Sequence, residues 1–213
     1  MLAKEIAGNL LDKKAVMVSI DPPFNWASGI KSPVYCDNRK MISHVAERKL
    51  VVEGFKKIIE EKGLEFDVIG GTATAAIPWA AFLAYDLGLP MIYIRPEKKE
   101  HGAGKQIEGA LDAGQKVLIV EDLISTGGSS VKAVEAVRGE GGCEVTDVLS
   151  IVSWEIPKSK TRFEEADLNL HVLTDYTNII GLAGERGDIP ADKMDVILKF
   201  KEDPSAWAEE MGL

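Results

Sequence analysis

Apolar residues follow two patterns along the chain, one at helical spacing and one in short unbroken runs. Between Met41 and Lys62 they recur every three or four positions among charged residues, and Gly63 follows, so this segment is predicted to be an amphipathic helix. Further along, short runs are rich in β-branched residues and bounded by Gly, Pro or acids. Such runs predict buried parallel strands. They cover residues 67–70, 90–94, 116–120 and 145–152.

Helical patterns separate the predicted strands. Residues 74–87 are rich in alanine, and residues 129–140 carry Val131, Val134 and Val137 at helical spacing. Strands that alternate with helices predict an α/β fold, in which right-handed crossovers build a doubly wound parallel sheet flanked by helices. Ligands bind such sheets beyond the carboxyl ends of the strands. We therefore expect functional residues directly after the strands.

Two segments interrupt the alternation. Residues 15–39 combine turn signals with short apolar pieces, and we interpret them as a small hood. Residues 97–113 are rich in glycine and charge and poor in apolar residues, which predicts a mobile loop or a lid that orders on ligand. We expect one domain over residues 1–213, with residues 1–39 as an N-terminal hood subregion and residues 40–213 as the α/β core and C-terminal elements.

Composition limits the partners and the compartment. The formal net charge of -9 argues against binding to nucleic acid or to an anionic membrane, so any phosphate site must be a local exception. Cys36 and Cys143 lie far apart without C-x-x-C spacing, which predicts neither a disulfide framework nor structural zinc. A reducing cytoplasm fits this usage best. No apolar run is long enough to span a membrane, so we expect a soluble protein.

The strongest chemical signal is residues 117–130, where a strand leads into two acids and then into a hydroxyl- and glycine-rich turn that opens a helix. Gly127 and Gly128 let the backbone approach a ligand closely, so that N–H groups at the helix start can point at one phosphate. Glu121 and Asp122 would repel a bare polyphosphate but accept well from sugar hydroxyls. A ribose monophosphate therefore matches both ends of this loop, with its hydroxyls at the acids and its phosphate at the glycine-rich turn. The alternative is that the acids cap the helix and the glycines only form a turn.

Two other phosphate motifs do not match. A Walker loop requires Ser or Thr after Gly-Lys, whereas Gly104-Lys105 is followed by Gln106. Gly102 and Gly104 begin a dinucleotide pattern, but Ile107 occupies the third glycine position. The sequence therefore predicts neither an ATP-type P-loop nor a dehydrogenase.

The sequence Val-Leu-Ile-Val-Glu-Asp-Leu-Ile-Ser-Thr-Gly-Gly-Ser of residues 117–129 resembles the phosphoribosyl-diphosphate signature of type I phosphoribosyltransferases. Residues 95–102 resemble the mobile catalytic loop of the orotate branch of this family, and residues 26–33 and 35–39 resemble its hood. The resemblance covers most of the chain. It implies transfer of ribose 5-phosphate from 5-phosphoribosyl 1-diphosphate to orotate, in the biosynthesis of pyrimidines and UMP.

The resemblance also implies roles for individual residues. Arg95, Lys99 and His101 fall on loop positions that contact the diphosphate, and Lys99 and His101 are the expected catalytic residues. Ser125 falls on a position that contacts orotate. By the same resemblance, the ribose-phosphate cradle is expected to comprise Glu121, Asp122, Leu123, Ile124, Ser125, Thr126, Gly127, Gly128 and Ser129.

The expected cofactor is Mg²⁺, held mainly through the substrate's diphosphate and not by dedicated protein ligands. The family resemblance further implies a homodimer in which the mobile loop reaches the active site of the neighbouring subunit.

Three positions depart from one branch of the family. Some orotate enzymes place lysine where this chain has Ala27 and Ala75, and arginine where it has Trp154. The group that holds the base carboxylate is therefore open, with Lys31, Arg39 and nearby backbone N–H groups as candidates.

Two other functions stay open. A phosphoribosyltransferase for a purine or uracil is disfavoured by the hood and by the Lys-Glu-His-Gly sequence of the loop. A noncatalytic regulator that binds phosphoribosyl diphosphate would need a nucleic-acid surface, and no basic helix is visible. For the cations near the loop, the default alternative is a solvated charged surface. These cations are Arg95, Lys98, Lys99 and Lys105.

Overall fold

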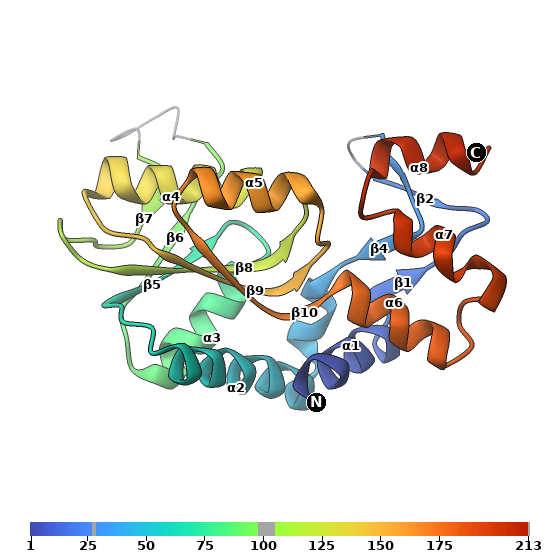
Figure 1. Ribbon diagram of the computed structural model, residues 1–213. Coiled ribbons are helices and arrows are strands. Elements are labelled where there is room, and N and C mark those ends of the chain that lie inside the picture. Colours follow the sequence, from blue (N-terminus) through green and yellow to red (C-terminus); the bar gives the residue numbers. More distant parts are fainter. Residues whose placement is uncertain (27–28, 98–104, 213) are drawn as a thin grey trace.

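The computed structural model describes residues 1–26, 29–97 and 105–212. Its centre is a six-stranded sheet (Figure 1). The strands are β5 (Val68–Thr72), β6 (Met91–Ile94), β7 (Ile107–Glu108), β8 (Val117–Ile124), β9 (Asp147–Ser153) and β10 (Asn169–Asp175). Their order is β10-β9-β8-β5-β6-β7, and every neighbouring pair is parallel except β6 and β7.

Helices cover both faces of this sheet (Figure 1). One layer holds α1 (Leu2–Asp12), α2 (Val45–Lys62) and α3 (Ile77–Leu87), and the other holds α4 (Gly128–Gly141) and α5 (Pro157–Glu165). A parallel sheet between helical layers confirms the predicted fold class. In the described residues no helix is both long and apolar enough to cross a membrane.

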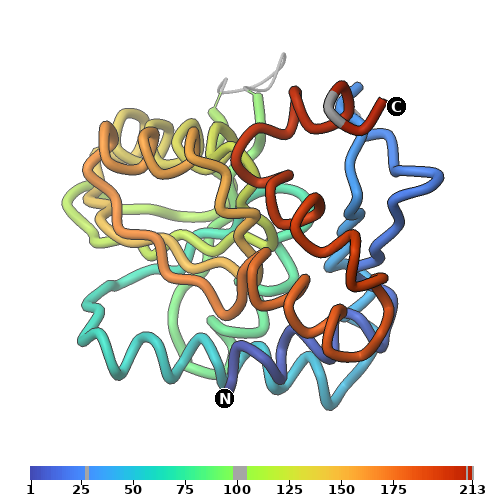
Figure 2. The backbone as a smooth tube through the Cα atoms, turned by 45° about the vertical axis from the view of Figure 1, so that its right-hand side comes forward, coloured from blue at the N-terminus to red at the C-terminus, as the bar shows by residue number. Residues whose placement is uncertain are grey.

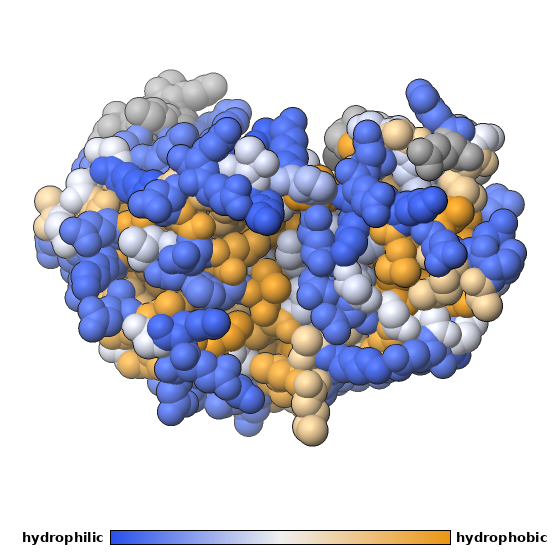
Figure 3. Space-filling model, viewed as in Figure 1, coloured by the Kyte–Doolittle hydropathy of each residue, from blue (hydrophilic) through white to orange (hydrophobic). Residues whose placement is uncertain are grey.

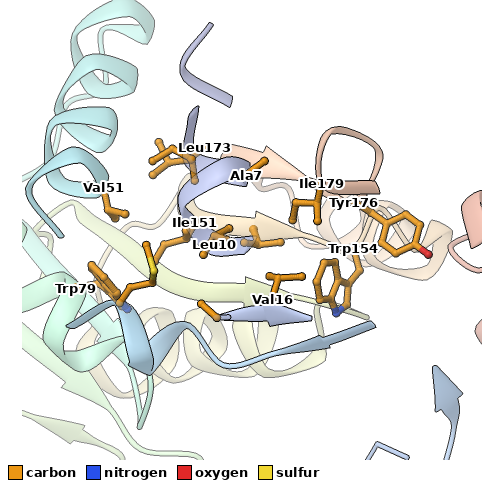
Figure 4. Packing of buried hydrophobic residues seen from close by; sticks show 14 of the residues in the cluster. Ala7, Leu10, Val16, Val51, Trp79, Ile151, Trp154, Leu173, Tyr176 and Ile179 are labelled. Carbon is orange, nitrogen blue, oxygen red and sulfur yellow. The ribbon is translucent and has the colours of Figure 1, made fainter. Parts of the chain in front are cut away.

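The apolar run at the start of β8 explains why helices must cover both faces of the sheet. Leu118 and Val120 belong to the hydrophobic cluster under α1, α2 and α3, whereas Val117 and Ile119 belong to the cluster under α4. Successive side chains of a strand point to opposite faces, so a strand buried on both sides reads as an unbroken apolar run. Figure 4 shows the first cluster, in which Leu10 and Ile151 lie between the sheet and the helices.

Most predicted elements are confirmed, with shifted ends. Strands β5, β6, β8 and β9 correspond to the four predicted runs, but β8 continues past Val120 to Ile124 and so includes both acids. The helix predicted from Met41 begins as the 3₁₀ helix η1 (Asn38–Ser43), and α2 starts only after His44. The structure adds β10, in which polar residues break the apolar run, and β7, which lies inside the segment predicted as a loop.

The order of the strands fixes where a ligand can bind. From β5 the chain passes through α3 to β6 on one side, and from β8 it passes through α4 to β9 on the other. The two helices lie on opposite faces, so the winding reverses between the adjacent strands β5 and β8. Crevices for ligands form at the carboxyl ends of strands at such a switch point.

The hood contains two small antiparallel sheets. They pair β1 (Val16–Val18) with β4 (Val34–Cys36), and β2 (Phe24–Asn25) with β3 (Lys31–Ser32). The C-terminal elements lie against them (Figure 2). These elements are α6 (Tyr176–Glu185), η2 (Ala191–Lys193), α7 (Met194–Lys199) and α8 (Pro204–Glu210).

Aromatic rings from both ends of the chain hold this lobe together. Phe200 is fully buried, and its ring centroid lies 5.5 Å from that of Trp26 and 5.6 Å from that of Trp207, both edge-on. Tyr176 lies 5.9 Å from the same ring. The hood is therefore completed by residues more than a hundred positions away, whereas α1 packs under the sheet against β10 and α6.

Replacing Phe200 with Ala should lower the free energy of unfolding by about 3–5 kcal/mol, because the cavity removes the ring that joins the hood to the C-terminal helices. Urea denaturation followed by circular dichroism measures this loss. The neighbouring exposed residue provides the control, since Lys199→Ala should change stability by less than about 0.5 kcal/mol. A Phe200→Ala variant as stable as this control would contradict the role given to the ring.

Candidate active site

The cradle predicted from the sequence forms one continuous strand, turn and helix at the switch point. Glu121 and Asp122 lie in β8, Ile124 ends the strand, and a short turn leads to Gly128 at the start of α4. The carboxyl end of β5 lies alongside, where the Thr72 hydroxyl is 3.4 Å from the Val120 carbonyl oxygen. The structure thus brings the predicted residues 121–129 to the end of the sheet where ligands bind.

Glu121 is buried inside the fold, with only 4% of its surface exposed. Its Oε1 accepts a hydrogen bond of 2.8 Å from the hydroxyl of Ser130, the third residue of α4. Burial, together with the charge of the nearby Asp122, raises the pKa of Glu121 to about 7, although hydrogen bonds from Ser130 and Thr72 oppose the rise. Both protonation states are therefore populated near neutral pH.

Asp122 is half-buried, and burial raises its pKa above the ordinary value. Asn38, which begins η1, donates to the Asp122 carbonyl oxygen at 2.7 Å. Beside it the Arg39 guanidinium donates to Asp37 at 2.6 Å, and its charge partly offsets the rise in the pKa of Asp122. The segment that resembles the family's hood, residues 35–39, therefore lies next to the acid end of the cradle.

The turn before α4 has the geometry that an anion site requires. Gly127 has a φ of +75° and precedes α4, whose N-terminus has no capping side chain among the described residues. The first N–H groups of a helix lack intrahelical partners and attract anions. Ser125 and Thr126 are half-buried in the turn, and Ser129 is exposed.

Arg162, which the sequence did not single out, is hydrogen-bonded to this turn. Arg162 of α5 donates from Nη1 to the carbonyl oxygen of Thr126 at 2.9 Å and to the Thr126 hydroxyl at 3.0 Å. A lone basic residue on a helix carries no sequence signal that separates it from a solvated charge. Only the packing of α5 against α4 reveals it.

Comparison with known proteins is consistent with this geometry. The phosphoribosyl transferase domain family matches residues 40–181. A curated orotate phosphoribosyltransferase from Streptococcus mutans is 48% identical over 208 residues, which is 98% of this chain and 99% of that protein. The chain belongs to the orotate phosphoribosyltransferase family. It is therefore an enzyme of the pentosyltransferase class. The resemblance of its sequence to the phosphoribosyltransferases is confirmed.

Solved structures agree. Orotate phosphoribosyltransferase from Aeropyrum pernix superimposes with a TM-score of 0.74 at 26% identity, covering 87% of this chain and 99% of that one. The UMP synthase of Leishmania donovani has a TM-score of 0.79 at 26% identity and covers 94% of this chain. This chain spans only 42% of that longer protein. The type I phosphoribosyltransferase fold is therefore established for the chain.

The base of the family's mobile loop is partly described. Arg95 follows β6, its backbone N–H donates to the Gln106 carbonyl oxygen at 2.9 Å, and its Nη1 lies 3.7 Å from Glu108. The Gln106 side chain donates back to the carbonyl oxygens of Arg95 and Pro96. The two sides of the loop therefore meet at its base. The predicted catalytic residues Lys99 and His101, and Lys98, lie outside the described residues.

The residues that depart from the family pattern differ in how deeply they are buried. Trp154 is buried to 1% exposure and packs edge-on against Tyr176, so it belongs to the core. Ala75 is half-buried after β5, and Ala27 lies outside the described residues. Of the candidates for the base carboxylate, Lys31 is exposed on β3, whereas Arg39 is paired with Asp37.

The molecule is hollowed at more than one place. Figure 3 shows a notch lined by hydrophilic residues on the upper rim, between the core and the lobe formed by the hood and C-terminal helices. A different hollow is lined by Lys116, Glu144 and Asp147. These residues lie at the amino ends of β8 and β9, opposite the cradle, so this hollow is not the candidate site.

The buried carboxyl of Glu121 makes stability depend on pH in an unusual direction. A folded-state pKa of about 7, above the ordinary 4.5, means that the native state binds more protons between these values. Stability should therefore fall as pH rises through this window. In Glu121→Gln the fall should be smaller by about 3 kcal/mol between pH of about 4.5 and about 7.5, as measured by urea denaturation.

A matched variant should act in the opposite direction. Ser130→Ala removes a hydrogen bond that favours the ionised carboxylate, so its stability should fall more steeply with pH than that of the wild type. Equal pH dependence in the wild type and in Glu121→Gln would show that Glu121 does not titrate in this window.

Proposed function

We propose that this protein transfers the ribose 5-phosphate group of 5-phosphoribosyl 1-diphosphate to orotate, giving orotidine 5′-monophosphate and pyrophosphate in pyrimidine biosynthesis. Membership of the orotate phosphoribosyltransferase family supports the reaction. The observation that carries the proposal is the juxtaposition at the end of β8, where an acid pair is followed by an uncapped helix N-terminus among the described residues.

The ribose phosphate fits this juxtaposition because its two ends differ in chemistry. We assign the 5′-phosphate to the N–H groups and hydroxyls of residues 125–129, which the dipole of α4 favours. Asp122 is the better acceptor for the ribose hydroxyls, since Glu121 already accepts from Ser130 inside the fold. Ionised Asp122 accepts such bonds strongly, because carboxylates form the shorter and stronger hydrogen bonds.

The reacting carbon bonds to a ring nitrogen of orotate as its bond to the diphosphate breaks, through an oxocarbenium-like state. The protein must therefore stabilise negative charge on the leaving group. We assign this to Arg95 at the end of β6 and, by resemblance, to Lys99 and His101. Bound Mg²⁺ would neutralise diphosphate charge, and the oxygen donors of residues 121–126 suit such a hard ion.

Mg²⁺ would be held chiefly by the substrate. Within the described residues no three His, Cys, Asp or Glu side chains converge on one point. The carboxylate of Asp122 and the hydroxyls of Ser125 and Thr126 would then orient the substrate that carries the ion. For the base we retain Ser125 as a contact, with Lys31 as the more available cation for its carboxylate.

A panel of bases tests the proposal. With phosphoribosyl diphosphate and Mg²⁺, orotate should be consumed and adenine, hypoxanthine and uracil should remain, as followed by ultraviolet absorbance and chromatography. Consumption of a purine with orotate inert would contradict the choice of base but leave the transferase class standing. Binding of phosphoribosyl diphosphate with every base inert would instead support a noncatalytic regulator.

We also propose that the protein is a homodimer whose loop acts on the neighbouring subunit. Mixed dimers that pair a Lys99→Ala subunit with an Asp122→Asn subunit should then retain about half of the wild-type activity, because both defects fall in one site. Action within one subunit would damage both sites. Activity as low as that of the two parent variants, or an active enzyme that sediments as a monomer, would contradict the arrangement.

A further inference from the structure

Helix α5 packs against the two glycines of the cradle. A Cβ on Gly127 would lie 3.0 Å from the Phe163 ring, and a Cβ on Gly128 would lie 2.8 Å from Nη1 of Arg162. The first distance is tighter than most real Cβ contacts, and the second would require the end of the Arg162 side chain to move. Gly128 has no positive φ, and the guanidinium fills the space that a side chain there would occupy.

The two bonds from Arg162 also set the direction of a hydroxyl. The oxygen of Thr126 accepts from the guanidinium, and Arg162 has no acceptor of its own. The hydroxyl hydrogen of Thr126 is therefore free to point away from Arg162, as a donor. The second bond holds the Thr126 carbonyl oxygen, which fixes the peptide that leads into Gly127. One guanidinium thus determines both a side-chain donor and the local backbone.

The charge of Arg162 is not neutralised by an ion pair. Its hydrogen bonds within the described chain go to Thr126 alone, and a side chain held by neutral oxygens keeps its full positive charge. Glu135 and Glu165 line the same groove between α4 and α5 without pairing with it at 4.0 Å or less in the described residues. Such a charge close to the start of α4 raises the local potential for an anion in an otherwise acidic protein.

We propose that Arg162 is a positioning residue for the phosphate end of the substrate. It orients the Thr126 hydroxyl and the turn at residues 125–128 and adds positive charge behind them, without touching the substrate. This inference rests on the proposed function. It predicts a selective defect in binding the ribose phosphate, whereas a purely structural staple between α5 and the turn would lower stability and affect both substrates alike.

The test compares Arg162→Ala and Arg162→Lys with a control on the same helix. Lys160→Ala removes an equal charge from an exposed side chain of α5 that lies beside Glu164. Calorimetry with ribose 5-phosphate gives Kd, and steady-state kinetics give KM for phosphoribosyl diphosphate and for orotate. Thermal unfolding checks that each variant is folded.

In Arg162→Ala, Kd for ribose 5-phosphate and KM for phosphoribosyl diphosphate should rise about tenfold, because two charge-assisted hydrogen bonds are lost. KM for orotate should stay within about twofold, as should every constant of Lys160→Ala. Guanidinium chloride at millimolar concentration should restore part of the lost affinity, and sodium chloride at equal ionic strength should not. Arg162→Lys keeps the charge but replaces the planar guanidinium, whose Nη1 donates both bonds, with a shorter side chain that ends in an ammonium group, so it should be intermediate.

Wild-type values of Kd and KM in Arg162→Ala would overturn the inference. Equal loss for both substrates with no rescue by guanidinium would overturn it as well, in favour of a structural staple. If Arg162→Ala does not fold, Arg162→Lys decides, since an unchanged Kd there would show that binding does not depend on the guanidinium contact with Thr126. If the wild-type protein fails to bind ribose 5-phosphate, the proposed function itself is wrong.

Discussion

Burial of β8 on both faces is the constraint on which the site depends. Residues 117–120 are exposed by 3% or less and are packed between the two helical layers, so the strand cannot shift or rotate without exposing apolar surface on one side. The position of the strand therefore fixes the position of the residues that directly follow it. Glu121, Asp122 and the turn into α4 are therefore placed by the core, and their approach to β5 follows from the strand order.

Charge at this end of the sheet is balanced locally and not by the protein as a whole. The chain carries a net charge of -9, yet the proposed substrate brings a phosphate and a diphosphate to this site. Burial raises the pKa of Glu121, which reduces the negative charge next to the α4 N-terminus, while Arg162 behind the turn supplies positive charge. Electrostatic attraction from a few nearby groups outweighs a net charge spread over a distant, solvent-screened surface.

The sequence predicted how the contiguous residues of the candidate site are arranged in strand, turn and helix. Residues 117–130 predict a strand, two acids and a helix start in one stretch, because each of these features depends only on neighbouring residues in the sequence. Contacts between distant segments left no periodic signal: Arg162 reaches Thr126 across 36 positions, and Asn38 reaches Asp122 across 84. The same reason explains why the C-terminal rings that complete the hood were not foreseen. β10 was missed because polar residues such as His171 interrupt its apolar pattern.

The central claim is that the turn between β8 and α4 binds the phosphate end of the substrate. Backbone amide resonances recorded during titration with ribose 5-phosphate test it most directly, since they report the N–H groups themselves. The account predicts that the largest saturable shifts fall on residues 125–130, with little change at Lys116, Glu144 and Asp147 on the opposite edge of the sheet. Shifts concentrated at that opposite edge, with residues 125–130 unmoved, would contradict it.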